Sequence, residues 1–125
     1  MEVLVKPNEN GTPSIILNKE EHYIEFTGKA LPEDAKAVYQ PIIDWLIVYP
    51  ANTFPELTMK FKLKCYNSAS SKYFIDMLAM LDKLNEHGMK ANVEWYYKNG
   101  DEDMMLEGQD IQEILQNTEV KLVEY

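Results

Sequence analysis

Several hallmarks of enzymes and membrane proteins are missing from this chain of 125 residues, which has one cysteine, two histidines and five glycines. Neither histidine stands at a recognisable spacing from a serine or cysteine that it would activate as a nucleophile. The glycines form neither a P-loop nor a dinucleotide-binding pattern. No apolar run approaches the roughly 20 residues of a membrane-spanning helix. The sequence therefore disfavours catalysis, predicts no cofactor and indicates no membrane segment.

Positive charge is also scarce. Twelve Lys and Arg stand against 21 Asp and Glu, so the formal net charge is −9. A nucleic-acid-binding protein needs a basic face to replace the counterions around phosphates, and an anionic membrane surface attracts cations. We therefore expect no nucleic acid and no membrane among the partners.

The composition otherwise fits one globular domain over residues 1–125, with 46% hydrophobic residues. The single cysteine, Cys65, falls on the apolar side of a predicted strand, where a core thiol suits a reducing compartment. The N-terminus carries no export signal. These observations predict a cytoplasmic protein.

The most informative stretch joins a strand to a helix. Apolar residues alternate over 57–65, which predicts a strand with one buried face. The spacing then changes to the i, i+3, i+4, i+7 stripe of an amphipathic helix over 70–86, beginning at Phe74. A run of small polar residues, Asn67 to Ser71, lies between them. Asn and Ser are preferred helix N-caps, so this run predicts the start of the helix.

The remaining segments alternate between the same two patterns. We predict strands at 2–5, 14–17, 23–26, 89–97 and 120–123, the second and third forming a hairpin that ends at Gly28. We predict a helix from 31 that is kinked or broken at Pro41, a connection over 50–55, and a last helix over 101–115 with a soft middle at Gly108. Strands that alternate with helices indicate an α/β fold, with helices packed on a sheet.

The serines before the central helix are candidate modification sites. A helix N-terminus favours negative charge, so a phosphate on Ser68 would be tolerated or stabilised. Lys72 lies in the first turn, on the wrong side of the helix dipole for a cation. Two explanations stay open at this point: Lys72 pairs with Asp76 at i+4, or it awaits an anion.

Two further candidates concern binding. The acidic segment 101–107 contains Asp101, Asp103 and Glu107, which suggest a divalent ion but lack the full EF-hand pattern. A small metal- or ligand-binding domain or enzyme using this segment is the alternative function. In the strand at 89–97, Tyr96 should face away from Trp95 and Tyr97. We therefore regard Tyr96 as a candidate for an exposed partner contact.

Several motifs in order resemble the SiaC family of bacterial regulatory phosphoproteins over nearly the whole chain. They are Leu31-Pro-Glu-Asp34, Tyr39-x-Pro-x-x-x-Trp45-Leu, Tyr66-Asn-Ser-x-Ser-Ser-Lys72, Val93-x-Trp-Tyr-Tyr97 and Asp101-Glu-Asp103 with Glu107-Gly108. The resemblance implies a mixed sheet flanked by helices, similar to STAS domains such as anti-sigma-factor antagonists. It also implies a protein without catalysis of its own.

The resemblance further implies a switch. A serine/threonine kinase would phosphorylate one hydroxyl at a helix start, a PP2C-like phosphatase would remove the phosphate, and the unmodified form would bind an effector such as a diguanylate cyclase. The family's Asn-Thr-Ser-Ser run places the acceptor on Ser68, beside Asn67 and near Lys72. Ala69 replaces a hydroxyl residue here, and Ser70 and Ser71 remain competing acceptors. A second departure from the family pattern is Ala30, where a helix-capping Ser or Thr is expected.

Overall fold

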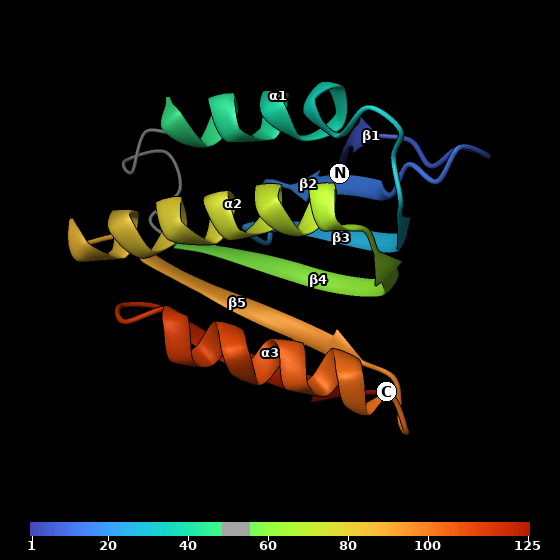
Figure 1. Ribbon diagram of the computed structural model, residues 1–125. Helices are drawn as coiled ribbons and strands as arrows, with labels where there is room; N and C mark the ends of the chain where they lie inside the picture. Colours follow the sequence, from blue (N-terminus) through green and yellow to red (C-terminus); the bar gives the residue numbers. More distant parts are fainter. Residues whose placement is uncertain (49–55) are drawn as a thin grey trace.

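The computed structural model describes residues 1–48 and 56–125, which form six strands and three helices (Figure 1). In chain order these are β1 (Glu2–Val5), β2 (Ser14–Asn18), β3 (Tyr23–Ala30), α1 (Ala35–Ile47), β4 (Glu56–Tyr66), α2 (Ser68–Glu86), β5 (Lys90–Tyr97), α3 (Glu102–Ile114) and β6 (Glu119–Glu124). All six strands belong to one sheet, in the order β1-β2-β3-β4-β5-β6.

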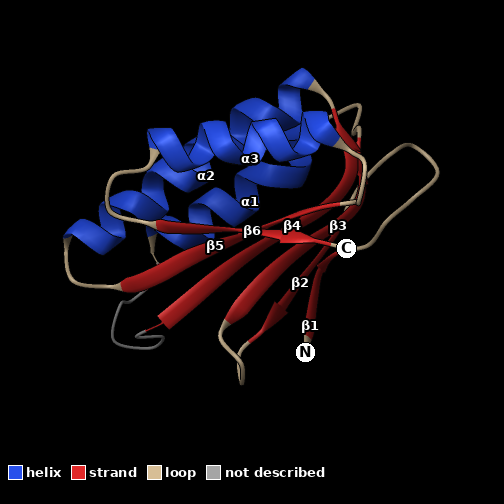
Figure 2. Ribbon diagram, turned by 90° about the horizontal axis from the view of Figure 1, so that it is seen from below, coloured by secondary structure: helices blue, strands red, loops and turns tan. Residues whose placement is uncertain are grey.

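The direction of the connections explains where the helices lie. The first three strands pair antiparallel, whereas β3, β4, β5 and β6 pair parallel. Each parallel crossover steps to the next strand in the same direction, and such crossovers are almost always right-handed. All three helices therefore cover the same face of the sheet (Figure 2). The predicted α/β class and mixed sheet are confirmed, with every helix on one face.

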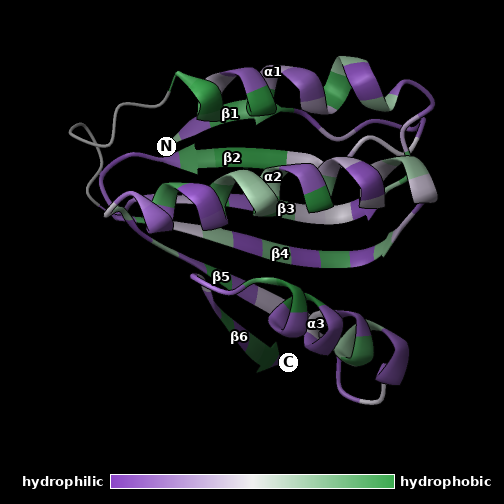
Figure 3. Ribbon diagram, turned by 60° about the vertical axis from the view of Figure 1, so that its left-hand side comes forward, coloured by the Kyte–Doolittle hydropathy of each residue, from purple (hydrophilic) through white to green (hydrophobic). Residues whose placement is uncertain are grey.

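Aromatic side chains fill the space between this face and the helices. The inward residues of β3 and β4 alternate with outward polar ones, as the hydropathy bands of β4 show (Figure 3). Phe26 and Phe61 stack with their ring centroids 4.7 Å apart, and Phe74 of α2 meets both rings edge-on. Such aromatic pairs contribute stability beyond the area they bury. They fix α2 above the centre of the sheet.

The predicted central strand and helix are confirmed as β4 and α2, with α2 beginning at Ser68. The hairpin of β2 and β3 is also confirmed, but its second strand does not end at Gly28. Gly28 has φ +90° and pairs with Leu63, and the register then shifts because Lys64 of β4 is the extra residue of a bulge, so β3 continues to Ala30. Cys65, which pairs with Lys29 at this bulge, is half-buried instead of a core thiol.

Helix α1 departs from the prediction at its start and in its middle. It begins at Ala35, because the side chain of Asp34 caps it by accepting a hydrogen bond from the Ala37 N–H at 3.1 Å. A Ser or Thr at Ala30 is thus unnecessary for this helix start. Pro41 lies inside an uninterrupted helix, on its exposed side. Pro41 has no N–H to donate to the Ala37 carbonyl. Ala37 is exposed, so water can donate to that carbonyl instead.

The buried side of α1 also differs from the predicted stripe. The spacing of apolar residues predicts a buried stripe of Ala35, Val38, Ile42, Trp45 or Leu46, and Tyr49. Ala35, Ile42 and Leu46 are buried as predicted, whereas Val38 and Trp45 are only partly buried and Tyr39, outside the stripe, is fully buried. The predicted Tyr49 and the connection over 50–55 lie outside the described residues.

Gly108 in α3 has a packing role, so the prediction of a soft helix middle is wrong. A Cβ atom at this position would lie 2.6 Å from Cδ1 of Trp95 and 2.5 Å from Cδ2 of Leu122. Trp95 is held in place because its Nε1 donates to the Met104 carbonyl at 2.9 Å. The helix therefore approaches the sheet as closely as a residue without a side chain permits.

Candidate functional site

The site is built on the turn between β4 and α2. Asn67 is the N-cap of α2, and its Oδ1 accepts a hydrogen bond from the Ser70 N–H at 2.9 Å. The Asn67 N–H donates to the Ala30 carbonyl at 3.1 Å, and its Nδ2 donates to the Pro32 carbonyl at 3.4 Å. One residue thus ties the helix start to the end of β3 and to the segment before α1. The predicted capping by this run is confirmed.

The three serines of the run have different surroundings. Ser68, the first residue of α2, is exposed, Ser71 is half-buried, and Ser70 is 0% exposed. The Ser70 hydroxyl donates its single proton to the Ala30 carbonyl at 2.9 Å. In the second bond of Ser70, at 2.7 Å, the Tyr39 hydroxyl is therefore the donor and Ser70 Oγ the acceptor. Burial raises the pKa of Tyr39, although the bond to Ser70 lowers it in part. Ser70 and Tyr39 therefore form a closed structural network.

Lys72 lies one turn into α2 and is exposed. Over residues 1–48 and 56–125 the structure has one ion pair, between Lys19 and Glu2 at 3.5 Å. The predicted pair of Lys72 with Asp76 is therefore not formed. Because no carboxylate of the described residues pairs with Lys72, its ammonium group, near the positive end of the helix dipole, is available to an anion.

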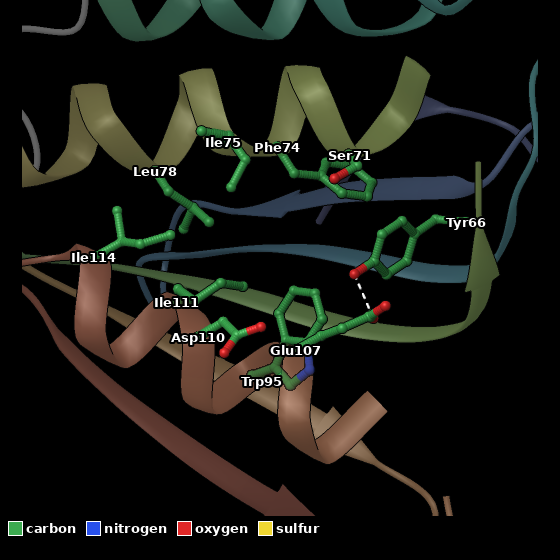
Figure 4. A pocket seen from close by; sticks show the side chains of 10 residues that line it. All are labelled: Tyr66, Ser71, Phe74, Ile75, Leu78, Trp95, Glu107, Asp110, Ile111 and Ile114. Carbon is green, nitrogen blue, oxygen red and sulfur yellow. Dashed lines mark hydrogen bonds between the residues drawn. The ribbon is translucent and has the colours of Figure 1, made fainter. Parts of the chain in front are cut away.

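A hollow of about 270 Å³ opens between α2 and α3 next to this turn (Figure 4). Aromatic and aliphatic side chains form most of its lining, with polar groups at one end. The lining residues are Tyr66, Ser71, Phe74, Ile75, Leu78, Trp95, Glu107, Asp110, Ile111 and Ile114. Ile75 and Ile114 are 41% and 58% exposed, so apolar surface faces solvent along both helices. Exposed apolar surface of this kind is a feature of binding sites.

The polar end of the hollow is acidic. The Tyr66 hydroxyl, at the end of β4, donates a hydrogen bond to Oε2 of Glu107 on α3. Burial, together with this bond and the charges of Glu107 and Asp110, holds the pKa of Tyr66 well above its usual value. The described lining contains these two carboxylates and no lysine. The hollow therefore favours apolar groups beside a positive charge.

Helix geometry places Ser68 at the end of this hollow. Ser68, Ser71 and Ile75 stand at i, i+3 and i+7 of α2, so they share one side of the helix. Ser71 and Ile75 line the hollow. A group attached to Ser68 would thus extend the same surface by one turn toward the helix N-terminus.

The acidic segment has a structural explanation. The carboxylate of Asp101 caps α3 by accepting from the Met104 N–H at 3.1 Å, and Glu102 and Asp103 occupy the first turn, where carboxylates favour the helix dipole. Within the described part of the chain, no three His, Cys, Asp or Glu side chains are grouped to hold a metal ion.

Tyr96 lies on the sheet face opposite the helices, whereas Trp95 lies on the covered face, as the alternation predicts. It is half-buried, because its hydroxyl donates to Glu94 at 2.7 Å and its ring meets Tyr125 edge-on at 6.4 Å. Burial, the bond to Glu94 and the charges of Glu94 and Glu25 raise the pKa of Tyr96 to about 12. Tyr96 is therefore on the other side of the sheet from Ser68.

Residues 6–125 match the model of the family described as SiaC family regulatory phosphoprotein. The chain belongs to the SiaC family. An uncharacterized protein of Pseudomonas aeruginosa strain UCBPP-PA14 is 24% identical over 96 residues, which are 77% of this chain and 76% of the relative. The turn at Asn67 and the hollow beside it are thus features of a SiaC family chain.

Solved SiaC structures share the fold. SiaC of Pseudomonas aeruginosa is similar with a TM-score of 0.85 and 20% identity, over 100% of both chains. A structure of the diguanylate cyclase SiaD in complex with its activator SiaC, from the same organism, contains a chain similar with a TM-score of 0.83 and 18% identity, over 96% of this chain and 98% of that one. None of the helices within the described ranges is long and apolar enough to cross a membrane.

Replacing the N-cap tests how the site of this SiaC family chain is held. We expect Asn67→Ala to lower the free energy of unfolding by about 0.5–2 kcal/mol, since the Ser70 N–H loses its acceptor. Urea unfolding measures this loss. Asn67→Asp keeps the accepting oxygen and is the matched control, and an equal loss in both variants would contradict a capping role.

Proposed function

We propose that this chain is a phosphorylation-controlled protein-binding switch with Ser68 as its acceptor. The observation that carries the proposal is the different burial of the three serines. A kinase must reach the hydroxyl, and Ser68 is exposed while Ser70 is fully buried and doubly hydrogen-bonded. Ser71 is half-buried in the wall of the hollow. Ser68 is therefore the most accessible acceptor in the run.

The fold has room for the added charge. A phosphate contributes about −1.5 to −2 charges at neutral pH. At Ser68 it would lie near the N–H groups of Ser68 and Ala69, which have no partner within the helix, and near the unpaired Lys72 one turn along. We expect the modified chain to remain folded, so the switch acts on binding.

The hollow explains how binding would respond. Its mouth already carries Glu107 and Asp110, and a phosphate at Ser68 adds further negative charge to the same surface. A partner that packs apolar groups against the helix start would have to desolvate the phosphate, which weakens its binding. Dephosphorylation would restore the surface.

We propose that a serine/threonine kinase adds the phosphate, that a PP2C-like phosphatase removes it, and that the unmodified chain binds an effector in the cytoplasm. A diguanylate cyclase is the effector we propose, because a structural relative is described as the activator of such an enzyme. The chain itself would carry out no catalysis.

The direct test combines site mapping with binding to a diguanylate cyclase from the same organism. Mass spectrometry of the native protein should find a phosphoryl group on Ser68. Ser68→Ala should bind and activate the cyclase like the unmodified chain, whereas Ser68→Asp should bind at least about tenfold more weakly, a change of about 1.4 kcal/mol. Titration calorimetry and cyclase rates give the two readouts.

Ala69→Asp is the matched control, because it adds the same charge at the next exposed position but about 100° around the helix. It should retain binding. A phosphate on Ser71 would move the acceptor and overturn the assignment to Ser68. Full binding by Ser68→Asp, together with no phosphate on any serine of the run, would overturn the switch.

A further inference from the structure

The sheet has one bare face, which is unusual for its parallel part. Strands β3 to β6 are parallel, and parallel sheets occur almost only with both faces covered. Here the three helices cover one face, and the described ranges supply no helix for the other (Figure 2). We call the outward side of β3–β6 the open face. The centre of this face holds three rows of outward side chains, the first of which is Tyr23, Thr58, Asn92 and Glu119.

Charges alternate across the open face. The strand register places Glu25 beside Lys60, Lys60 beside Glu94 and Glu94 beside Lys121. This row crosses all four parallel strands with the signs −, +, −, +. Opposite charges on neighbouring strands usually attract and pair.

These charges are not neutralised by ion pairs within the chain. In the described residues the one ion pair joins Lys19 and Glu2, away from this row. The Lys60 ammonium instead lies 3.9 Å from the centre of the Tyr23 ring, and Glu94 accepts the Tyr96 hydroxyl. The row is thus held against the sheet by aromatic rings and a hydroxyl, and no opposite charge of the described residues neutralises it.

The row is complementary to itself. A two-fold axis can run parallel to the strands, in front of the open face and midway between β4 and β5. Rotation about this axis places a second copy face to face with the first, so that the β3 end of one row lies against the β6 end of the other. Glu25 of one copy then faces Lys121 of the other, and Lys60 faces Glu94. We propose that the open face is the interface of a two-fold symmetric dimer of this chain.

The neighbouring rows obey the same symmetry. In the row of Tyr23, Thr58, Asn92 and Glu119, the axis places the Tyr23 hydroxyl against the Glu119 carboxylate and Thr58 against Asn92. Each contact joins a hydrogen-bond donor to an acceptor. In the next row, the axis places Lys62 of one copy against Tyr96 of the other, an ammonium against an aromatic ring. Within one chain the Lys62 ammonium already lies 5.8 Å from the centre of the Tyr96 ring and 4.6 Å from that of Tyr125.

The electrostatic balance of this face also suits self-association. Over these three rows the lysines Lys60, Lys62 and Lys121 balance the glutamates Glu25, Glu94 and Glu119. These three rows are thus neutral in a chain of net charge −9, which lets two copies approach here. Packed sheets lie about 10 Å apart, a gap that Lys and Glu side chains span together. Four strands give an interface at the small end of the range, so the dimer is weak.

Charge reversal tests the dimer. In sedimentation velocity the full chain should associate reversibly, and Lys60→Glu or Glu94→Lys alone should weaken association at least about tenfold, because each creates two like-charge contacts. An equimolar mixture of the two variants should regain it, since the new glutamate of one copy faces the new lysine of the other. Mixing the two variants cannot repair a folding defect in either chain, so recovered association reports on the interface alone.

Lys36→Glu and Glu113→Lys make the same charge changes on exposed positions of α1 and α3 and should associate like the unaltered chain. A chain that stays monomeric up to about 1 mM would overturn the proposal. Association that Lys60→Glu leaves unchanged, or a mixture no stronger than its components, would do the same. None of these results depends on the state of Ser68, which lies on the helix side of the sheet.

Discussion

Ser70→Asp is expected to lower the free energy of unfolding by about 3–5 kcal/mol, the usual cost of an unpaired buried charge. Ser70 is fully buried between the Ala30 carbonyl and the Tyr39 hydroxyl. A carboxylate there would face the carbonyl oxygen without a proton to donate. Urea unfolding at neutral pH measures the loss.

The pH dependence identifies the cause. Burial favours the neutral form of the new carboxyl, so its pKa in the folded state lies above its unfolded value of about 3.9. The destabilisation should therefore be largest above the folded pKa and disappear as the pH falls to about 4. Ser68→Asp, at the exposed helix start, should change stability by less than about 1 kcal/mol. Equal losses in the two variants would show that Ser70 is not enclosed.

Gly108→Val is expected to lower the free energy of unfolding by about 2–3 kcal/mol. The first added carbon already lies within 2.6 Å of Trp95 and Leu122 atoms, so either α3 must rise from the sheet or the indole must move. Movement of the indole would break the Nε1 bond of Trp95 to the Met104 carbonyl. Urea unfolding, with a change in tryptophan fluorescence, is the measurement.

Gln109→Val is the control on the neighbouring exposed position of the same helix. It introduces the same branched side chain without the contact, and should cost only about 0.5 kcal/mol through helix propensity. If Gly108→Val were no worse than this control, the close approach of α3 to the sheet would be wrong.

The sequence pattern was sufficient for the elements and insufficient for their contacts. The alternation over β4 and the stripe of α2 arise because one side of each element is buried. A short stretch of sequence is enough to reveal such a period. The sequence of α3 alone does not predict the packing role of Gly108, because its neighbours Trp95 and Leu122 come from β5 and β6. Proline in a helix interior usually predicts a kink or a break. Pro41 causes no break in α1, because it lies on the solvent side of the helix.

The phase of helix α2 distinguishes two of the serines. Ser70 stands four residues before Phe74, so it continues the buried stripe of α2 and must point into the core, whereas Ser68 falls off that stripe. Tyr39 likewise stands four residues after Ala35 and four before Ile43, both of which are buried. Helix phase therefore separates the two serines. The bond between Ser70 and Tyr39 joins residues 31 positions apart, and no local pattern predicts it.

The agreement between strand order and chain order has a consequence for biosynthesis. Each new strand pairs with the one made just before it, so the sheet grows at one edge as the polypeptide leaves the ribosome. The antiparallel strands β1, β2 and β3 pair first and leave β3 as the edge, and every later helix–strand unit docks on an edge that already exists. We expect chains truncated after β5 to retain a sheet but to present an unprotected strand edge, which promotes aggregation until β6 arrives.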